Sequence, residues 1–514
     1  MKKKNNLIKN YKSGDSIFFI DRERVEAAYI NSYLAASINS KYKKKIIVYS
    51  DFIYKDKILN LYKKFGFKFF VSGIDSKLRY LIKPIFSIKS IFLTLYCIIN
   101  ISNKNFLWLI NKFKVNNILV GDLIYDTYIR YNSNYLNPKL DLNFIKLLFV
   151  SIFRTLLLIN NFAKYNVKFL IVGTSHYSFN SGIALRISTY QNRFRNYLYH
   201  TPVKKGYLEI MEHTKNTKLI GYNSLQDKKI LKRFKSISIK MSGINKFYFK
   251  RKKLKTKNFY THTSFASANK GKGLKFLNLI EKIRSEKKVV LYASHKLSDV
   301  VHMLGISYSF LDYYDQFKET LIHVFKNDDK NIWIFRPHPA SGLGPERKQL
   351  HELFLKYPKK NILFCPHNVP IDKLKEKCDL VISGRGTAAL EFACEQKPSI
   401  VAGTPRYFHK DLGLNCCTNK KEYFSLLNKI DKIKMPNNIS KETARKILYF
   451  YENGLHPKIK IDYKEYSKDI YAKKIFDIGM KKNNINDKDL LDIEKIFQLD
   501  LENSYFYKLI RKIV

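Results

Sequence analysis

Two short segments of the 514-residue chain combine residue types that suit phosphate binding. In Arg336–Pro339, two prolines restrict the backbone and so fix where the guanidinium of Arg336 and the imidazole of His338 point. In Ser383–Thr387, two glycines let the backbone approach a ligand, and two hydroxyls add donors. A helix predicted directly after this segment would supply free N–H groups and a positive dipole end. The predicted phosphate-binding residues are Arg336, His338, Ser383, Gly384, Arg385, Gly386 and Thr387.

Glu391 is a further candidate on the helix predicted after this glycine turn. It lies one helical turn beyond Thr387, on the same face, where it could accept hydrogen bonds from ribose hydroxyls. Each segment also has a structural interpretation: a proline-rich turn with an incidental histidine, or a tight strand–helix turn capped by Thr387. A lone Gly-x-Gly is weak evidence, but two phosphate-suited turns at strand ends of one domain are a more specific signal.

The elements that must position these segments alternate between short apolar runs and amphipathic stretches of helical length. This alternation predicts βαβ units and parallel sheets. In the second half the predicted strands are Val289–Ala293, Asn331–Phe335, Asn361–Phe364, Leu380–Ser383 and Ser399–Ala402. In the first half they are Ser16–Ile20, Lys45–Tyr49, Phe67–Val71, Asn116–Val120 and Val167–Val172. Ligands bind beyond the carboxyl ends of parallel strands, and both candidate segments fall at such ends.

The polar, basic stretch Arg251–Lys257 has no core-forming pattern, and we interpret it as a linker between two halves. The predicted organisation is a Rossmann-like domain over 1–250, a second over 258–440 and a charged helical tail over 441–514. The predicted fold class is therefore α/β, with two doubly wound domains that face a cleft.

The charge balance is extreme, with 94 Lys and Arg against 43 Asp and Glu and a formal net charge of +51. A field of this sign favours phosphates, nucleic acid or an anionic membrane surface. The abundant Lys, Asn, Ile, Phe and Tyr also share A/T-rich codons, so genomic drift explains the charge equally well. The basic residues are dispersed and no nucleic-acid-binding motif is visible. We therefore expect no nucleic-acid partner, and a basic nucleic-acid-binding protein is kept as an alternative.

Six cysteines in so long a chain form neither a disulfide framework nor a paired CxxC zinc motif. This usage predicts a reducing, cytoplasmic location and no structural metal. The spacing of His295, Asp299 and His302 suits metal ligation, but no fourth ligand is in view. We therefore expect this segment to be a loop that borders the ligand site.

Two windows, 81–100 and 143–162, are apolar enough to raise the question of a membrane. Lysines or an arginine interrupt both windows, which argues against spanning helices. We expect a soluble chain or one peripheral to the inner face of the cell membrane. A membrane-facing patch is predicted around Lys43–Lys45 and Lys83–Lys89, because juxtamembrane lysines are attracted to anionic leaflets.

Four segments of the second half together resemble bacterial surface and capsular polysaccharide glycosyltransferases. These segments are Ser294–His302, Asp312–Tyr314, Arg336–Pro339 and Ser383–Gly403. The resemblance, which covers roughly 290–410 and is fainter in the first half, implies the GT-B fold. The His-Pro pair followed by a hydroxyl-bearing glycine turn is also similar to bacterial CMP-sialic acid and CMP-Kdo transferases. That likeness implies donor-phosphate contacts for His338, Ser383 and Thr387.

The resemblance further implies that the first domain binds the acceptor and supplies a catalytic base. Such a base must lie at a strand end near the attacking hydroxyl. Asp122 follows the predicted strand Asn116–Val120, and His176 follows Val167–Val172. Each is equally explained as a capping residue or a satisfied polar residue in the core. The predicted catalytic residues are Asp122, His176 and His338.

These observations predict a glycosyltransferase of capsule or lipopolysaccharide synthesis that uses neither a metal nor another cofactor. The donor would be a nucleotide-activated sugar, with a CMP-sugar as one candidate, and the acceptor a surface polysaccharide or lipid-linked glycan. A nucleotide-sugar 2-epimerase and a polyol-phosphate transferase are alternatives on the same fold. The predicted partners are the donor, the glycan acceptor and an anionic membrane surface.

Overall fold

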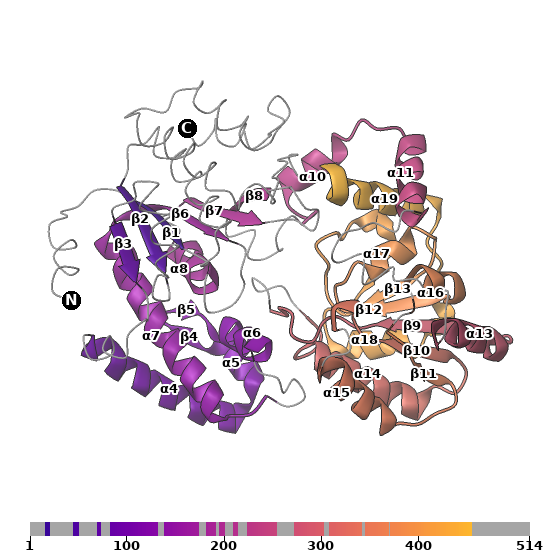
Figure 1. Ribbon diagram of the computed structural model, residues 1–514, viewed down its shortest axis with the longest axis horizontal. Helices are drawn as coiled ribbons and strands as arrows, with labels where there is room; N and C mark the ends of the chain where they lie inside the picture. Colours follow the sequence, from indigo (N-terminus) through magenta and orange to yellow (C-terminus); the bar gives the residue numbers. More distant parts are fainter. Residues whose placement is uncertain are drawn as a thin grey trace. The chain divides into compact units, whose positions relative to one another are not determined.

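The computed structural model describes residues 16–20, 45–50, 69–72, 83–131, 138–173, 181–191, 195–200, 209–213, 224–253, 272–302, 308–341, 345–367, 369 and 371–454. The chain divides into two compact units, which are drawn in Figure 1. The first unit comprises 1–128, 139–215 and 456–514, and the second comprises 129–138 and 216–455.

The second unit is built on a parallel sheet of six strands. The strands are β9 (Val289–Ala293), β10 (Ile332–Arg336), β11 (Ile362–Phe364), β12 (Leu380–Ser383), β13 (Ser399–Val401) and β14 (Asn415–Cys416). Their order is β11-β10-β9-β12-β13-β14, and every neighbouring pair is parallel. In chain order this is the 3-2-1-4-5-6 arrangement of dinucleotide-binding sheets. The chain reverses its direction of winding between β9 and β12.

Both faces of this sheet are buried, and each face has its own hydrophobic core. Successive side chains along a strand point to opposite faces and so enter the two cores in turn. Val289 and Leu291 pack in one core, while Val290 and Tyr292 pack in the other. Helices cover both faces, as a doubly wound fold requires. They are α10 (Lys228–Lys235), α11 (Met241–Lys253), α13 (Lys272–Arg284), α14 (Tyr313–Asn327), α15 (Pro345–Leu355), α16 (Ile371–Lys377), α17 (Ala388–Ala393), α18 (Lys420–Leu427) and α19 (Asn438–Tyr449).

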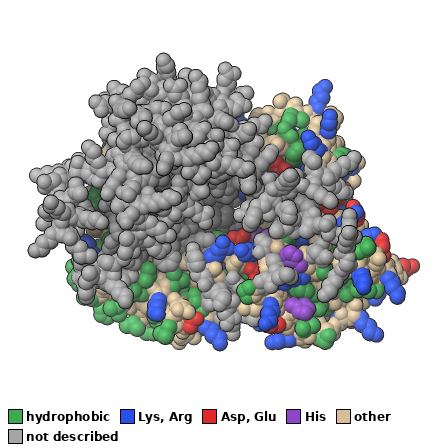
Figure 2. Space-filling view, in the orientation of Figure 1, with side chains coloured by type: hydrophobic (Ala, Val, Ile, Leu, Met, Phe, Trp, Pro, Cys, Tyr) green, Lys and Arg blue, Asp and Glu red, His purple; other side chains and the backbone are tan. Residues whose placement is uncertain are grey.

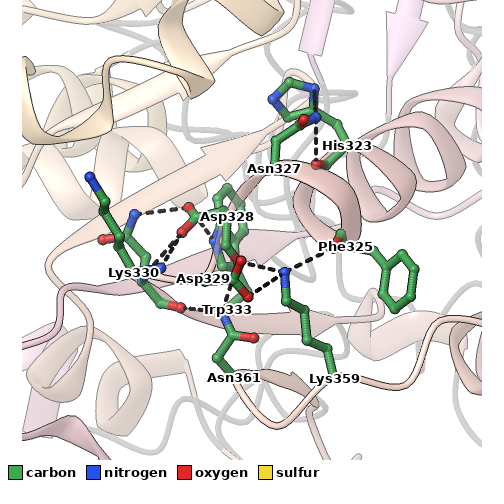
Figure 3. Close-up of polar contacts among 10 residues, drawn as sticks. His323, Phe325, Asn327, Asp328, Asp329, Lys330, Trp333, Lys359 and Asn361 are labelled. Carbon is green, nitrogen blue, oxygen red and sulfur yellow. Dashed lines mark hydrogen bonds and ion pairs between the residues drawn. The ribbon is translucent and has the colours of Figure 1, made fainter.

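A hydrogen-bond network around Asp328 fixes the amino end of β10 (Figure 3). The Asp328 carboxylate accepts from the backbone N–H of Asn331 at 3.0 Å and from the Trp333 indole at 2.9 Å. Burial alone would raise the pKa of Asp328, but these hydrogen bonds lower it below its usual range. Lys359 and Asn361 donate to the backbone carbonyl of Asp328, which joins the start of β11 to the same network. The network therefore anchors the amino ends of β10 and β11, and β10 carries Arg336 at its opposite, carboxyl end.

The first unit contains a second six-stranded sheet with the same winding order. Its strands are β1 (Ser16–Ile20), β2 (Lys45–Ser50), β3 (Phe69–Ser72), β6 (Val167–Gly173), β7 (Arg195–His200) and β8 (Glu209–His213). Their order is β3-β2-β1-β6-β7-β8, and only the last pair is antiparallel. The predicted α/β class with parallel sheets is therefore confirmed.

The helices of the first unit are α4 (Pro84–Lys104), α5 (Phe106–Lys112), α6 (Gly121–Tyr131), α7 (Leu142–Lys164) and α8 (Ile183–Gln191). Helices α4 and α7 pack along each other and are long and apolar enough, by length and composition, to cross a membrane. Helix α7 begins at the cap Asp141, whose carboxylate accepts from the Phe144 N–H at 2.7 Å. Most of α7 is buried, including Arg154.

The strand predicted at Asn116–Val120 is wrong. The chain instead forms a small antiparallel hairpin of β4 (Lys114–Val115) and β5 (Ile118–Leu119). Asn116 and Asn117 occupy its two-residue turn with φ of 47° and 64°. Asparagine tolerates this left-handed conformation, and Asn-Asn between apolar residues is a hairpin signal rather than the start of a sheet strand.

The boundary between the units also differs from the expected one. Helices α10 and α11 belong to the second unit, where Phe234 and Tyr248 enter its core. The stretch Arg251–Lys257, expected to be a linker, begins inside α11. Of the predicted tail, the structure describes α19 and the turn Phe450–Gly454.

Candidate functional site

Three strands of the second sheet end together at its carboxyl edge, and each is followed by a candidate residue. His295 follows β9, His338 follows β10, and the glycine turn Ser383–Thr387 follows β12. Because β9 lies between β10 and β12, these segments are neighbours at the point where the strand order reverses. Ligands of open parallel sheets bind at this point.

The imidazole of His295 is the centre of a stack of rings at this edge. It lies flat on the Tyr313 ring, with centroids 4.2 Å apart and planes 11° from parallel. On the other strand end, the His338 ring lies 5.9 Å away at 23°. Sequence reasoning left His295 out of the binding residues and treated it as part of a bordering loop. Its position directly after a buried strand was the signal that could have found it.

The glycine turn packs directly against these rings. A Cβ on Gly384 would lie 2.9 Å from the Tyr308 hydroxyl and 3.0 Å from Cε1 of Tyr313, so no other residue fits without displacement. The Gly386 carbonyl accepts from the Tyr407 hydroxyl at 2.6 Å. Thr387 precedes α17 but makes no side-chain cap, and α17 is only six residues long. Its helix dipole is therefore a small contribution, and positive charge must come from side chains.

Arg385 supplies that charge from the middle of the turn. Its Nη1 donates to the Val301 carbonyl at 2.6 Å, and its guanidinium carbon lies 4.9 Å from the centroid of the Tyr308 ring. The cation–π contact and the hydrogen bond orient the guanidinium before any ligand arrives. Its charge also acts on His295, whose pKa it lowers.

Both histidines are held in the neutral form. Burial is the main cause that lowers the pKa of His338 to about 3, and the neighbouring Arg336, Lys296 and ionisable His295 oppose a charge on this imidazole as well. Burial is also the main cause that lowers the pKa of His295, and the charge of Asp299 opposes it only in part. The His295 Nδ1 lies 3.7 Å from the Asp299 carboxylate, too far for a hydrogen bond, and has no hydrogen-bond partner among the described residues. A ligand oxygen at this edge would be met by imidazole N–H donors and a guanidinium.

Two predicted site residues take part in a separate network of buried charges. The Glu391 carboxylate pairs with Arg251 of α11 at 3.2 Å and with Lys375 of α16 at 3.7 Å. Burial alone would raise the pKa of Glu391, but these cations lower it. Arg336 is buried, donates to the Val369 carbonyl at 3.2 Å and senses the Glu391 charge. Both side chains therefore already have protein partners. The contacts of Glu391 with ribose and of Arg336 with phosphate stay predictions.

In the first unit, Asp122 is engaged in the same way. Its two carboxylate oxygens accept from Nη1 and Nη2 of Arg186 on α8, at 3.0 and 2.7 Å, and both side chains are buried. Such a bidentate pair is a strong structural contact. Because the segment before it pairs in the β4-β5 hairpin and not in the six-stranded sheet, the topological argument for Asp122 as a base is lost. His176 lies outside the described residues.

No cluster of three or more His, Cys, Asp or Glu among the described residues is arranged to hold a metal ion. The spacing of His295, Asp299 and His302, which suits a metal, therefore does not produce such a cluster in this part of the chain.

Comparison with known proteins gives distant structural likenesses only. No protein-family model and no curated protein sequence matches the chain. The beta Kdo 2,7 transferase KpsC of Thermosulfurimonas dismutans is 13% identical over 56% of this chain and 79% of that chain, with a TM-score of 0.30. HepE of Anabaena in complex with UDP-glucose is 10% identical over 86% and 96%, with a TM-score of 0.27. A Listeria monocytogenes protein assigned as a UDP-N-acetylglucosamine 2-epimerase is 12% identical over 86% and 97%, with a TM-score of 0.25. Similarities of this size do not discriminate between sugar transfer and epimerisation.

Proposed function

We propose that the second unit binds a nucleotide-activated sugar at the carboxyl ends of β9, β10 and β12, and that the chain is a GT-B glycosyltransferase. The observation that carries the proposal is the convergence of His295, His338 and the Arg385 turn at the switch point of the sheet. These groups supply hydrogen-bond donors and positive charge, and burial is the main cause that keeps both imidazoles neutral. A nucleotide phosphate is the anion that complements such an edge.

In the proposed reaction, the acceptor hydroxyl oxygen forms a bond to the anomeric carbon of the sugar. The bond between that carbon and the phosphate oxygen breaks, and the nucleotide departs with both bonding electrons. Arg385 and the N–H of neutral His338 stabilise the charge that grows on the departing phosphate. Because this charge is larger in the transition state than in the bound donor, the contacts accelerate the reaction.

The proton of the acceptor hydroxyl must pass to a base, which the proposal assigns to Asp122 or His176. For Asp122 to act, one carboxylate oxygen must turn a free lone pair to the hydroxyl while Arg186 holds the other. The proposed acceptor is a surface polysaccharide or a lipid-linked glycan, and a CMP-sugar is the first donor to test.

A thermal-shift screen of the full chain against CMP, CDP, UDP and GDP tests the donor site. We expect one nucleotide to raise the melting temperature, since a ligand that binds only the folded state stabilises it. Arg385→Ala should abolish this shift. Arg284→Ala is the control, because its guanidinium pairs with Asp379 at 2.6 Å, directly before the amino end of β12 and therefore at the opposite edge of the sheet.

The sugar nucleotide identified in this way then separates the enzyme classes. Transfer of the sugar to an added glycan supports the proposal. Isomerisation of the free sugar nucleotide would instead favour the epimerase, and transfer of a polyol phosphate would favour the polyol-phosphate transferase. If none of the four nucleotides shifts the wild-type melting temperature, the site does not bind nucleotide and the proposal is wrong.

A further inference from the structure

Helix α4 presents a large apolar face to solvent, which is unusual for a helix of a soluble domain. Ile85, Phe92 and Ile99 are 77%, 68% and 60% exposed. Ile88, Ile91, Leu95 and Tyr96, also exposed, complete the face. Since residues on a helix advance by about 100° each, these side chains share one side of α4. An apolar surface of this continuity marks an interaction site.

The opposite side of α4 carries the small and polar residues. Ser90, Thr94, Cys97 and Ile101 are buried where the helix packs on α7 and α5. The Ser90 hydroxyl donates to the carbonyl one turn earlier, that of Phe86, at 2.6 Å. A soluble helix buries its large side chains and exposes its small and polar ones, so the pattern of α4 is reversed. Small residues at helix contacts with large apolar ones outside are typical of helices in contact with lipid.

The charge around this face has one sign. From residue 83 to residue 120 the sequence contains lysines at 83, 89, 104, 112 and 114 and no aspartate or glutamate. Figure 2 shows apolar side chains with interspersed basic ones at the lower left edge of the molecule, where Figure 1 places α4. Tyr96 packs edge-on against Trp108 of α5, with centroids 5.7 Å apart. Tyr and Trp are enriched where a membrane meets water.

We infer that α4 and α5 form a membrane-docking surface that inserts its apolar side chains into an anionic bilayer, with α4 lying in the plane of the interface. A lying helix is favoured over a spanning one because one side of α4 is held against the domain by α7 and α5. Uniform positive charge selects an anionic surface over a protein groove of mixed charge. The inference does not depend on the proposed function, because it concerns binding in the absence of nucleotide.

Of the predicted membrane-facing segments, Lys83–Lys89 lies on this surface. Lys43 and Lys44 lie outside the described residues. Lys45 lies at the start of β2, with its ammonium 5.9 Å from the centroid of the Tyr165 ring. The proposed docking surface therefore includes the Lys83–Lys89 segment of the predicted patch, and it is built on α4 rather than on the start of β2.

Co-sedimentation of the full chain with vesicles tests the inference. We expect binding to vesicles of phosphatidylcholine and phosphatidylglycerol and much weaker binding to phosphatidylcholine alone. Ile88→Asp and Phe92→Asp should each weaken binding roughly tenfold, since each removes an apolar side chain from the bilayer. Lys83→Gln and Lys104→Gln should each weaken it roughly fivefold, and only on the anionic vesicles. Acrylamide quenching of Trp108 should fall on binding, whereas the other tryptophan, Trp333, is buried throughout.

Ile439→Asp is the matched control, because Ile439 is 63% exposed on α19 of the second unit and should leave binding unchanged. Circular dichroism and the melting temperature establish that the α4 variants are folded. Wild-type binding that Ile88→Asp and Phe92→Asp do not reduce would overturn the inference, as would indifference of the wild type to both vesicles. The wild type could instead form a dimer and fail to bind vesicles. If Phe92→Asp then converted this dimer to a monomer, the apolar face of α4 would be assigned to self-association.

Discussion

Two groups of charged and titratable side chains lie in the second unit, and they differ in what neutralises them. Around Glu391, carboxylates and cations neutralise one another: Arg251 and Lys375 pair with Glu391, and Lys375 also pairs with Asp372 at 2.6 Å. At the strand ends, the group consists of two neutral imidazoles and a guanidinium held by a backbone carbonyl and a tyrosine ring.

The difference separates a structural role from a binding role. Mutually paired buried charges are costly to disturb, because removing one partner leaves another charge without compensation in a dry environment. At the strand ends, a carbonyl and a tyrosine ring hold the Arg385 guanidinium without carrying a negative charge to neutralise it, so this edge gains from an incoming anion. Both regions hold residues that the sequence assigned to ligand binding. The predictions below test whether the two roles separate as the geometry indicates.

The largest effect is expected for Glu391→Gln on stability. The substitution leaves Lys375 and Arg251 underneutralised, and we expect a loss of about 3–5 kcal/mol in the free energy of unfolding of the second unit. The chain has two tryptophans, one in each unit, so Trp108→Phe leaves Trp333 to report urea unfolding of the second unit alone. Glu376→Gln is the control, because its pair with Lys373 has the same 3.2 Å separation but is exposed. It should cost at most about 1 kcal/mol. Equal losses for the two variants would contradict the structural role of Glu391.

The strand-end residues should show the opposite behaviour. His338→Ala and Arg385→Ala should each slow sugar transfer by about 100- to 1000-fold, equivalent to about 2.7–4 kcal/mol, because each removes a preorganised partner of the departing phosphate. Their melting temperatures should change little. His323→Ala, in which a histidine of α14 loses its contact with Asn428, should retain full activity. Initial rates and melting temperatures measured on the same preparations decide the matter, and near-normal rates for both variants would remove these residues from the site.

The strands that carry the site could be predicted from the sequence to within a residue or two. Val289–Ala293 and Leu380–Ser383 are runs of apolar residues buried on both faces, and their short length and flanking polar residues mark their ends. The positions of His338 and of the glycine turn follow directly from these strand ends. Local pattern was sufficient there because each segment is positioned by the strand that immediately precedes it.

Long-range pairing was beyond the reach of such patterns. Arg251 and Glu391 are 140 residues apart, and no periodicity connects them. A basic stretch read alone favours a solvated linker, whereas Arg251 is 12% exposed and neutralised by Glu391 and Glu452. The sheet strand predicted at Asn116–Val120 was wrong for another reason. The apolar run after the turn at Asn116 and Asn117 pairs with the segment just before that turn, and not with a strand of the large sheet.

The smallest predicted effect is a pH dependence of stability that belongs to His338. Its pKa is about 3 in the folded chain and 6.5 in the reference state, so between these values the unfolded chain binds one more proton than the folded one. Stability therefore falls as pH decreases from 7 to 5, by up to about 2 kcal/mol for this group. His338→Gln should remove that part of the slope. The pKa of Glu391 is lowered below 4.5, so its stabilisation is lost only under more acidic conditions than this window, and the comparison of wild type with variant isolates the part that belongs to His338. Urea unfolding followed by Trp333 fluorescence at both pH values measures the change in the free energy of unfolding. If this change is identical for wild type and variant, His338 is protonated in the folded protein at pH 5 and the prediction is wrong.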